Sequence, residues 1–401
     1  MRKSSLFIIF LVVFLDLLGF GMVIPILPYY AKSFGATATT LGWLMVCYSG
    51  MQLLFSPFWG RISDRVGRRL VLLTCIAGLS LSMFILGLAS SLTWLFIGRL
   101  LAGFFGANIS TAAAYIADIT PPENRAKGMG MIGAAFGLGF LFGPAIGGLL
   151  SKWGYGTAAF AAAGLSAANF FFALMKLGEP KLSLEERAKH RNRFTARMWK
   201  ETLTVRTTGL PIILFFLITT GVAQVEVSFA LYLLERFQLD AQHAGMILAL
   251  VALSMAAIQG GAIGTLTKNF GEATLVMAGV MCMAVGLLGA VRGPTIHYFI
   301  GAFLFYGLGY GLINPSLSSL VSRFARPGAQ GATMGIYQSA GSLARIVGPL
   351  LAGALFDFYG IKIPFYFAVG MCLIALLFVV SGRSVWNFEQ KRCEPELVME
   401  S

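Results

Sequence analysis

The chain has 401 residues, of which 57% are hydrophobic and only 12% are charged. A soluble domain of this composition would not stay dispersed in water, so the composition excludes an ordinary soluble protein and indicates that lipid is the solvent. The net charge of +13 is also typical of nucleic-acid-binding surfaces. We expect no nucleic-acid partner, however, because the basic residues have no folded soluble domain on which to form such a surface.

Twelve apolar segments, separated by short polar joints, divide the chain. Each is close to the length of about 20 residues with which a helix crosses a bilayer. The segments lie near residues 5–30, 41–59, 70–89, 92–118, 128–150, 157–177, 209–234, 244–266, 273–291, 295–321, 332–356 and 364–381. The sequence therefore predicts an all-α membrane protein with twelve transmembrane helices embedded in a lipid bilayer.

The basic residues test this layout, since an even number of spans places both termini and every second joint on one side. Of the 30 Lys and Arg residues, 23 lie at the N-terminus, in the joints that follow even-numbered spans or in the tail. Five lie in the opposite joints, and Arg99 and Arg345 lie within spans. Short basic loops stay in the cytoplasm, so we expect a multi-pass protein of the inner membrane with both termini cytoplasmic.

The joint after the second span is the most compact charged run in the chain, Gly60-Arg61-Ile62-Ser63-Asp64-Arg65-Val66-Gly67-Arg68-Arg69. It is too short to be anything but a tight turn between two helices on the cytoplasmic face. We expect Gly60 to let two backbones approach closely, and Asp64 to cap the third helix and face the dipole of another helix. Such a charge–dipole latch would hold the cytoplasmic side shut. The alternative is that the arginines only anchor the topology.

The fifth span is rich in glycine and contains one proline. Small residues four positions apart let helices pack backbone to backbone in lipid. The residues that form this pattern are Gly139, Gly143, Pro144, Gly147 and Gly148. Helix packing alone would also explain the glycines.

A basic stretch at 179–208 separates six spans from six, and the two halves repeat faintly. Gly143-Pro144 corresponds to Gly348-Pro349, and the Gly60 joint corresponds to residues 264–271, where Lys268 replaces Asp64 and Asn269 replaces Arg65. We interpret this as duplication followed by loss of the charge in one copy. The predicted organisation is two pseudo-symmetric six-helix bundles at 1–178 and 209–382, joined by a cytoplasmic linker at 179–208 and followed by a cytoplasmic tail at 383–401. Secondary transporters have this architecture, with a site near the midplane between the repeats.

The Gly60 joint resembles the signature between helices 2 and 3 of the major facilitator superfamily. Four other segments look like the twelve-helix drug:proton antiporter branch, and the first half is most similar to the tetracycline exporters. These segments are Asp16 to Pro28, Arg99 with Gly103, Ala114 to Thr120, and Gly139-x-x-x-Gly143-Pro144-x-x-Gly147-Gly148.

The resemblance implies the major facilitator fold and export of drugs in exchange for protons. It also implies that Asp118 pairs with Arg65 or Arg68, and that the motif from Gly139 to Gly148 seals the interface between the halves against leak. The tetracycline exporters have acidic residues where this chain has Ser82 and Met283. Tetracycline itself is therefore not implied.

Four charged residues lie well inside spans, away from the span ends, where an unpaired charge costs several kcal/mol. Asp16 and Arg99 lie in the first half, and Glu226 and Arg345 lie in the second. We hypothesise that the two acids couple transport to protons and that the arginines set their pKa values, because a carboxylate that holds either a proton or substrate makes the two exclude each other. Two static ion pairs that lock helices together are the alternative.

Five amide side chains at mid-span could line a substrate cavity or form interhelical hydrogen bonds. They are Asn108, Gln224, Gln259, Asn314 and Gln338.

No segment matches an ATP-binding loop, and His190, His243 and His297 form no catalytic or metal-binding set, so we expect neither an enzyme, nor a metal site, nor a cofactor. The predicted function is export of amphiphilic small molecules by a proton-driven antiporter that works as a monomer. A transporter of a defined metabolite such as a sugar, and a non-transporting receptor or scaffold, stay open as alternatives.

Overall fold

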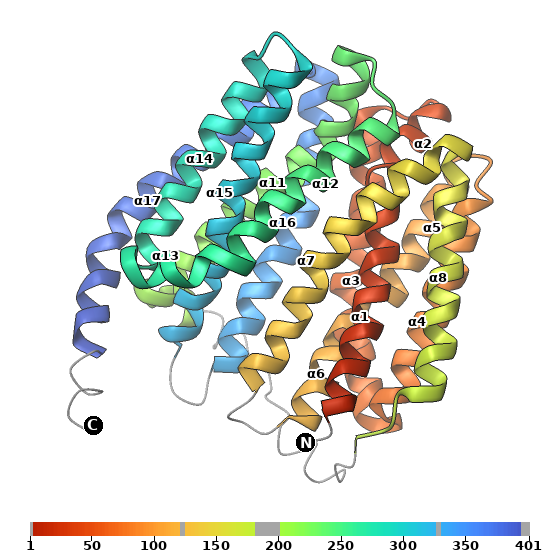
Figure 1. Cartoon of the computed structure of the whole chain (residues 1–401), viewed down its shortest axis with the longest axis horizontal. Coiled ribbons are helices and arrows are strands. Elements are labelled where there is room, and N and C mark those ends of the chain that lie inside the picture. Colours follow the sequence, from red (N-terminus) through yellow and green to blue (C-terminus); the bar gives the residue numbers. More distant parts are fainter. Residues whose placement is uncertain (1–2, 121–124, 181–200, 326–329, 394–401) are drawn as a thin grey trace. The chain divides into compact units, whose positions relative to one another are not determined.

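The structure is a computed structural model that describes residues 3–120, 125–180, 201–325 and 330–393. Helices account for nearly all of these residues, and twelve of them are long and apolar enough to cross a membrane (Figure 1). The mean hydropathy of their most apolar windows lies between 1.2 and 2.8. The twelve predicted spans and the all-α membrane class are thus confirmed, and the chain is a multi-pass membrane protein.

By its internal contacts the chain forms two compact units. Unit 1 comprises Met1–Arg191, Val227–Ala252 and Ala352–Ile361, and unit 2 comprises Asn192–Glu226, Leu253–Leu351 and Lys362–Ser401. The division of the sequence into bundles at 1–178 and 209–382 stays a prediction. Most of the basic residues of the predicted linker, and the end of the predicted tail, lie outside the described residues.

Unit 1 contains the first six spans. Its helices are α1 (Lys3–Val23), α2 (Leu27–Ser33), α3 (Ala38–Val66), α4 (Arg68–Gly87), α5 (Leu92–Phe105), η1 (Gly106–Asn108), α6 (Ile109–Ile119), α7 (Arg125–Leu150), η3 (Ser151–Trp153) and α8 (Tyr155–Lys176). Helix α1 packs against α7 and α8, α4 packs against α8 and α5, and α3 packs against α5. α1 is therefore a central element of this unit.

The remaining spans follow in the second part of the sequence. They are α11 (Arg206–Phe237), α12 (Ala241–Ala257), the π-helical turn η4 (Ile258–Ala262), α13 (Ile263–Phe270), α14 (Glu272–Arg292), α15 (Ile296–Arg323), α16 (Gln330–Tyr359) and α17 (Ile363–Cys393). Within unit 2, α14 packs against α15 and α17. α17 runs past residue 382, where the tail was expected to begin.

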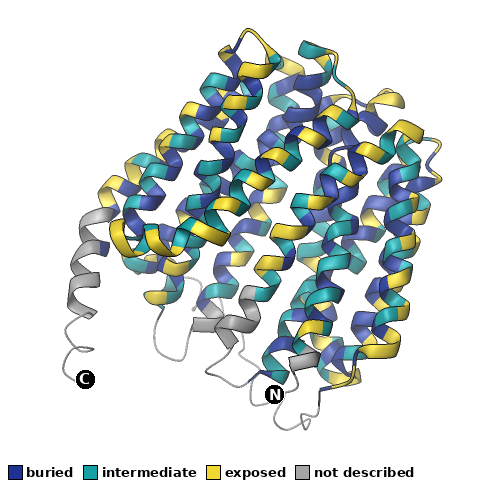
Figure 2. Ribbon diagram, viewed as in Figure 1, coloured by how far each residue is buried: buried dark blue, intermediate teal, exposed yellow. Residues whose placement is uncertain are grey.

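Burial follows the pattern expected of helices in lipid. Figure 2 shows buried and exposed residues alternating around the helices. Large apolar side chains remain exposed, among them Leu54, Trp153 and Leu377 at 71%, 69% and 73%. Such exposure would be unfavourable in water, but it suits a surface that contacts lipid tails.

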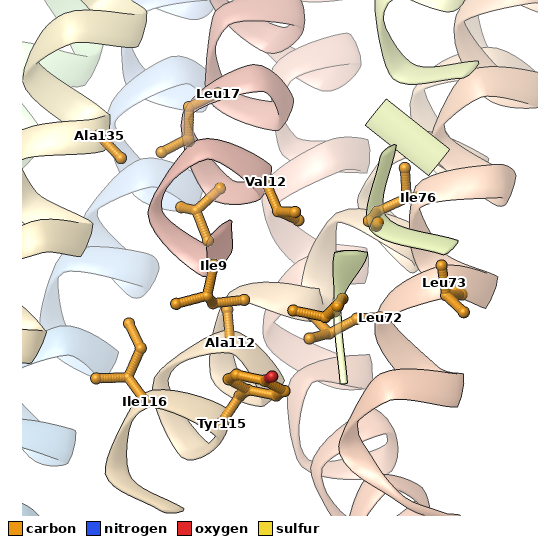
Figure 3. Packing of buried hydrophobic residues seen from close by; sticks show 13 residues of the cluster. Ile9, Val12, Leu17, Leu72, Leu73, Ile76, Ala112, Tyr115, Ile116 and Ala135 are labelled. Atoms are coloured by element: carbon orange, nitrogen blue, oxygen red, sulfur yellow. The ribbon is translucent and has the colours of Figure 1, made fainter. Parts of the chain in front are cut away.

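One apolar cluster in unit 1 fixes the position of α1. It joins residues of α1, α4, α6, α7 and α8, including Val12, Leu17, Leu72, Ile76 and Ala135 (Figure 3). Val12 and Leu17 are 1% and 5% exposed, so the turns of α1 on either side of residue 16 are held by packing. This packing holds the backbone of residue 16 in a defined place.

Candidate functional site

Asp16 lies in the middle of α1, where two amide side chains hold its carboxylate. Oδ2 accepts a hydrogen bond of 2.8 Å from Nδ2 of Asn108, and Oδ1 accepts one of 3.0 Å from Nδ2 of Asn169. Asn108 is the last residue of η1, and Asn169 belongs to α8. Two segments that are far apart in the sequence thus supply the donors that an ionised carboxylate on α1 needs inside a membrane protein.

A small cavity lies beside this carboxylate. Its volume is about 30 Å³, and Asp16, Phe20, Tyr48, Met83, Asn108 and Ser166 are among the residues that line it. A water molecule needs a cavity of about 10 to 15 Å³ on this measure. The cavity therefore has room for water, which can bring a proton to Asp16, but it has no room for a drug-sized molecule in this conformation.

Arg99 on α5 is 2% exposed and lies against aromatic rings. Its guanidinium carbon is 4.5 Å from the centre of the Tyr48 ring and 5.8 Å from that of Phe20. Nε also donates to the carbonyl oxygen of Leu44 at 3.4 Å. The hydrogen bonds to Asp16 come from amides, and Tyr48 and Phe20, which lie against Arg99, line the same cavity as Asp16. The role of Arg99 in proton coupling stays a prediction.

The glycine motif of α7 faces the backbone of α1. A Cβ atom at Gly139 would lie 2.9 Å from the carbonyl carbon of Leu17, and one at Gly143 would lie 2.7 Å from that of Gly21. A Cβ at Gly147 would overlap the carbonyl oxygen of Met22. These glycines allow the two backbones to touch, as small residues do in membrane helices.

The rest of the motif meets α12 within the same unit. A Cβ at Gly148 would lie 3.0 Å from Cα of Gly245, while a Cβ at Gly245 would overlap the carbonyl oxygen of Pro144. Both glycines are needed here for close approach. The predicted role of the motif in sealing against leak remains a prediction.

The joint between α3 and α4 is organised by Arg68, which is 7% exposed. Its Nε lies 3.0 Å from Oδ2 of Asp118, and its Nη1 lies 2.6 Å from Oδ1 of Asp64. Gly67 makes the turn with a φ of +107°, a backbone conformation that favours glycine. The structure therefore brings together Asp64, Gly67, Arg68 and Asp118, four of the six residues of the predicted latch.

Two expectations about this joint differ from the structure. Asp64 lies in the last turn of α3, and the cap of α4 is the carboxylate of Glu179, which accepts hydrogen bonds of 2.7 and 2.8 Å from the backbone N–H groups of Arg68 and Arg69. Within unit 1, no described atom outside the neighbouring backbone of α3 lies within 4 Å of a Cβ built at Gly60, so no second backbone of this unit approaches it closely. Arg65 is exposed, and the partner of Asp118 is Arg68.

The corresponding joint between α13 and α14 in unit 2 has an ion pair of its own. Gly271 turns the chain with a φ of +75°, and the next residue, Glu272, is only 5% exposed. Its Oε1 lies 3.4 Å from Nη1 of Arg323 and accepts a hydrogen bond of 3.1 Å from Ser319. The second copy therefore has an ion pair at the start of its helix with the signs exchanged relative to Arg68 and Asp118, although its joint lacks the charge of Arg65.

Glu226 on α11 and Arg345 on α16 both lie in unit 2. Glu226 is partly buried and Arg345 is exposed. Tyr310 on α15 interacts electrostatically with both of them. This shared neighbour places the two charges in one region of unit 2, while their roles in coupling stay predictions.

The other predicted amides occupy different environments. Gln224 is fully buried, Gln259 lies in the π-helical turn η4, Asn314 is partly buried and Gln338 is exposed. Only Asn108 lines the cavity beside Asp16. Within the described ranges, no group of three or more His, Cys, Asp or Glu residues could hold a metal ion.

Sequence reasoning missed Asn169 and Glu179. The sequence could have indicated Asn169, because it is the single amide side chain in an apolar span, as Asn108 is in its own span. Glu179 gives no such signal, since it lies just beyond a span at the start of a charged stretch.

The twelve apolar helices define a multi-pass membrane protein. The carboxylate of Asp16, bound by two amides, gives its unit 1 a polar site in the interior. The chain belongs to the Major Facilitator Superfamily, whose sequence model matches residues 9–349 and, in a second match, residues 228–392. The tetracycline resistance protein, class E, of Escherichia coli is 31% identical to it over 359 residues, which cover 86% of each chain. The quinolone resistance protein NorA of Staphylococcus aureus (strain COL) is 27% identical, over 94% of this chain and 96% of the relative.

Solved structures support the same fold. A bacterial homolog of the human lysosomal transporter Spinster, in an inward-facing and occupied conformation, matches with a TM-score of 0.78 at 14% identity. The match covers 96% of this chain and 97% of that one. The human organic anion transporter MFSD10 matches with a TM-score of 0.70 at 25% identity, over 94% of this chain and 99% of that one.

Proposed function

We propose that this protein is a proton-coupled antiporter that exports amphiphilic small molecules, including tetracycline-like drugs, by alternating access. The observation that carries this proposal is the carboxylate of Asp16, held by Asn108 and Asn169 beside a cavity of water size. The names of the relatives support drugs as the substrate class, since one is a tetracycline resistance protein and another a quinolone resistance protein.

A carboxylate in this position can exchange a proton for substrate. When it is ionised it attracts a cationic or zwitterionic molecule, and when it is protonated it does not. Because the two states exclude each other, entry of protons down their gradient can drive substrate outward. Asp16 and Glu226 are the proposed coupling acids, with Arg99 and Arg345 adjusting their protonation, and the proton gradient is the energy source without any cofactor.

The proposed orientation places both termini in the cytoplasm of a cell with an inner membrane. The excess of Lys and Arg at the N-terminus, in the joints after even-numbered spans and in the tail supports it. The Arg68 network then lies on the cytoplasmic face, where it would hold α3, α4 and α6 together while the halves rock. The proposed active form is a monomer.

The test is substrate-driven proton release in inverted membrane vesicles. Asp16→Asn and Glu226→Gln remove the titratable group with little change of shape, and each should lower the rate of proton release at least tenfold. Asp240→Asn is the matched control. Although partial burial opposes its ionisation, hydrogen bonds from His243 hold the pKa of Asp240 below its usual value, so it stays ionised at neutral pH and carries no proton.

Unchanged proton release in Asp16→Asn would remove this residue from the coupling mechanism. If neither variant differs from the parent protein, the acids are static, and the proposal of coupling through them is wrong.

A second candidate is transport of a defined metabolite by the same fold. The likeness to an organic anion transporter at 25% identity supports it. Uptake and efflux assays with and without a proton uncoupler separate the two, because drug export by antiport should stop when the gradient is collapsed. A receptor or scaffold, in contrast, should tolerate the loss of both acids.

A further inference from the structure

Asn169 is the one member of the Asp16 site whose side chain is completely enclosed, with 0% exposure. Both of its N–H bonds are used, one to Oδ1 of Asp16 at 3.0 Å and one to the backbone carbonyl oxygen of Val12 at 2.9 Å. Its own Oδ1 is buried and accepts no hydrogen bond from any residue that the structure describes. A buried amide oxygen without a donor is unfavourable, so its presence calls for a reason.

The protonation state of Asp16 supplies one. An ionised carboxylate only accepts hydrogen bonds, and it faces two N–H donors here, so the observed arrangement fits ionised Asp16. A proton on Oδ1 of Asp16 would turn that atom into a donor that points at another donor. The unused acceptor, Oδ1 of Asn169, belongs to the same amide group as the Nδ2 that faces Asp16. Rotation of this amide by half a turn would exchange the positions of the two atoms.

We propose that Asn169 is a positioning residue that responds to the protonation of Asp16. A proton from the aqueous medium, relayed by water in the cavity, adds to Oδ1 of Asp16, and the Asn169 amide rotates by half a turn so that its oxygen accepts the new O–H. The rotation takes Nδ2 away from the carbonyl oxygen of Val12 and breaks that bond. The inference rests on the proposed function, because it requires Asp16 to take up a proton.

Asn108 is less suited to this role. It lines the cavity, where water can satisfy its polar atoms in either protonation state. Asn169 is fully buried and does not line that cavity, so a proton on Oδ1, the oxygen that Asn169 binds, is accommodated by rotation of its amide. The response is therefore assigned to the α8 side of Asp16.

The other titratable groups around Asp16 come from the helices that pack near α1. The titratable groups nearest to Asp16 are Tyr48 on α3 and Cys75 on α4, with Arg99 on α5 against the Tyr48 ring. On the remaining elements that pack around α1, the titratable residues are Tyr115 and Asp118 near the end of α6, and Tyr155 and Lys176 at the two ends of α8. Between Met131 and Leu150, α7 has none. Among the residues that the structure describes, the hydrogen-bond partner of Oδ1 of Asp16 is Asn169.

The broken bond has a structural consequence. Val12 lies one turn before Asp16 on α1 and belongs to the apolar cluster that α1 shares with Ala173 and Leu177 at the end of α8 (Figure 3). The Asn169–Val12 bond joins these two helices at the same level. Proton uptake would loosen α1 from α8 and so convert a chemical event at one atom into a change in helix packing.

Infrared difference spectroscopy of the purified protein in lipid, between high and low pH, tests this proposal. Protonated Asp16 should give a carboxylic C=O band that is absent from Asp16→Asn, and its frequency should be that of a hydrogen-bonded acid. Asn169→Leu removes the amide at similar volume, so the band should move to higher wavenumber because the O–H has lost its acceptor. Asn169→Ala adds no atoms and gives the same test if the leucine variant does not fold. Thr157→Ala, on the same helix but outside the lining of the cavity, should leave the band in place.

The outcomes separate the inference from the proposed function. A band that keeps its position in both Asn169 variants overturns the role of Asn169 and leaves proton uptake by Asp16 intact. The absence of any Asp16-dependent band over the pH range of transport overturns both. A band that moves in the Asn169 variants, together with at least a tenfold loss of substrate-driven proton release, is the expected result.

Discussion

The α3–α4 and α13–α14 joints have the same plan but opposite charges. In each, a helix ends at a glycine with positive φ, the next helix begins at once, and its first residue pairs with a charge near the end of the following span. In unit 1 the pair is Arg68 with Asp118, and in unit 2 it is Glu272 with Arg323. The residue four positions before the first residue of each helix also changes sign, from the acid Asp64 before Arg68 to the base Lys268 before Glu272.

The helix dipole explains why the two joints are not built alike. A positive charge at the first position of a helix is unfavourable, because the free N–H groups there already carry partial positive charge. α4 begins with Arg68, and the carboxylate of Glu179 binds its first two N–H groups. α14 begins with Glu272, whose own charge suits the dipole. A separate acid is therefore needed only in unit 1.

The largest effect is expected for Arg68→Ala. It leaves Asp64 and Asp118 without their shared cation, and the Asp118 side chain is only 13% exposed. Removing one partner of a largely buried pair should lower the free energy of unfolding by about 3 kcal/mol. Unfolding by SDS in mixed micelles, monitored by tryptophan fluorescence, measures the loss.

Arg61→Ala is the control for Arg68→Ala, since Arg61 is exposed in the same joint. Equal stability of the two variants would show that the network around Arg68 contributes nothing beyond a surface charge.

The next effect concerns the two turn glycines. Gly67 and Gly271 have φ values of +107° and +75° with ψ near 150°, a region almost restricted to glycine. Alanine should cost about 1 kcal/mol at Gly271 from backbone strain. At Gly67 it should cost about 2 kcal/mol, since its Cβ would also lie 2.9 Å from Oε1 of Glu179. The same SDS titration measures both losses in the free energy of unfolding. In a Glu179→Ala background, the loss caused by Gly67→Ala should fall toward the loss caused by Gly271→Ala.

Arg323→Ala should have a smaller effect than Arg68→Ala. Arg323 is 48% exposed and bonds to Glu272 at 3.4 Å, while Ser319 remains as a donor. We expect a loss of about 1 kcal/mol, with recovery in Arg323→Lys. A loss as large as that of Arg68→Ala would mean that the two pairs contribute alike, which would contradict the dipole argument.

The sequence predicted the spans, because about 20 apolar residues have few alternatives to a membrane helix. It also predicted that Asp16 matters, since charges within spans are costly. The pairing of Asp118 with Arg65 or Arg68 was implied by the resemblance to the major facilitator superfamily. The sequence did not predict the second ion pair. Glu272 takes the place of Arg68, and Arg323 takes the place of Asp118. A comparison that looks for the same residue types at corresponding positions therefore does not find the pair.

Partners that depend on tertiary packing were also missed. Asn169 reaches Asp16 because α8 packs against α1, and Glu179 reaches α4 because the chain turns back after α8. Neither contact follows from spacing along the chain. The aromatic rings of Tyr48 and Phe20 around the guanidinium of Arg99 are likewise brought together by packing, and no spacing along the chain reveals them.

The smallest effect is expected for Lys268→Asp, which gives the second joint the acid of the first. Lys268 is exposed in the last turn of α13, where a positive charge suits the helix end and lies one turn before Glu272. The substitution removes the favourable charge and adds a like charge near Glu272, for a loss of about 0.5 kcal/mol at low salt. Lys268→Asn should lose less, and 1 M NaCl should remove the difference between the two variants, because exposed charges are screened. If the difference in stability between the two variants persists in high salt, Lys268 acts through a packed contact and not through its charge. The exchange of charges between the two joints would then not explain the stability of the second joint.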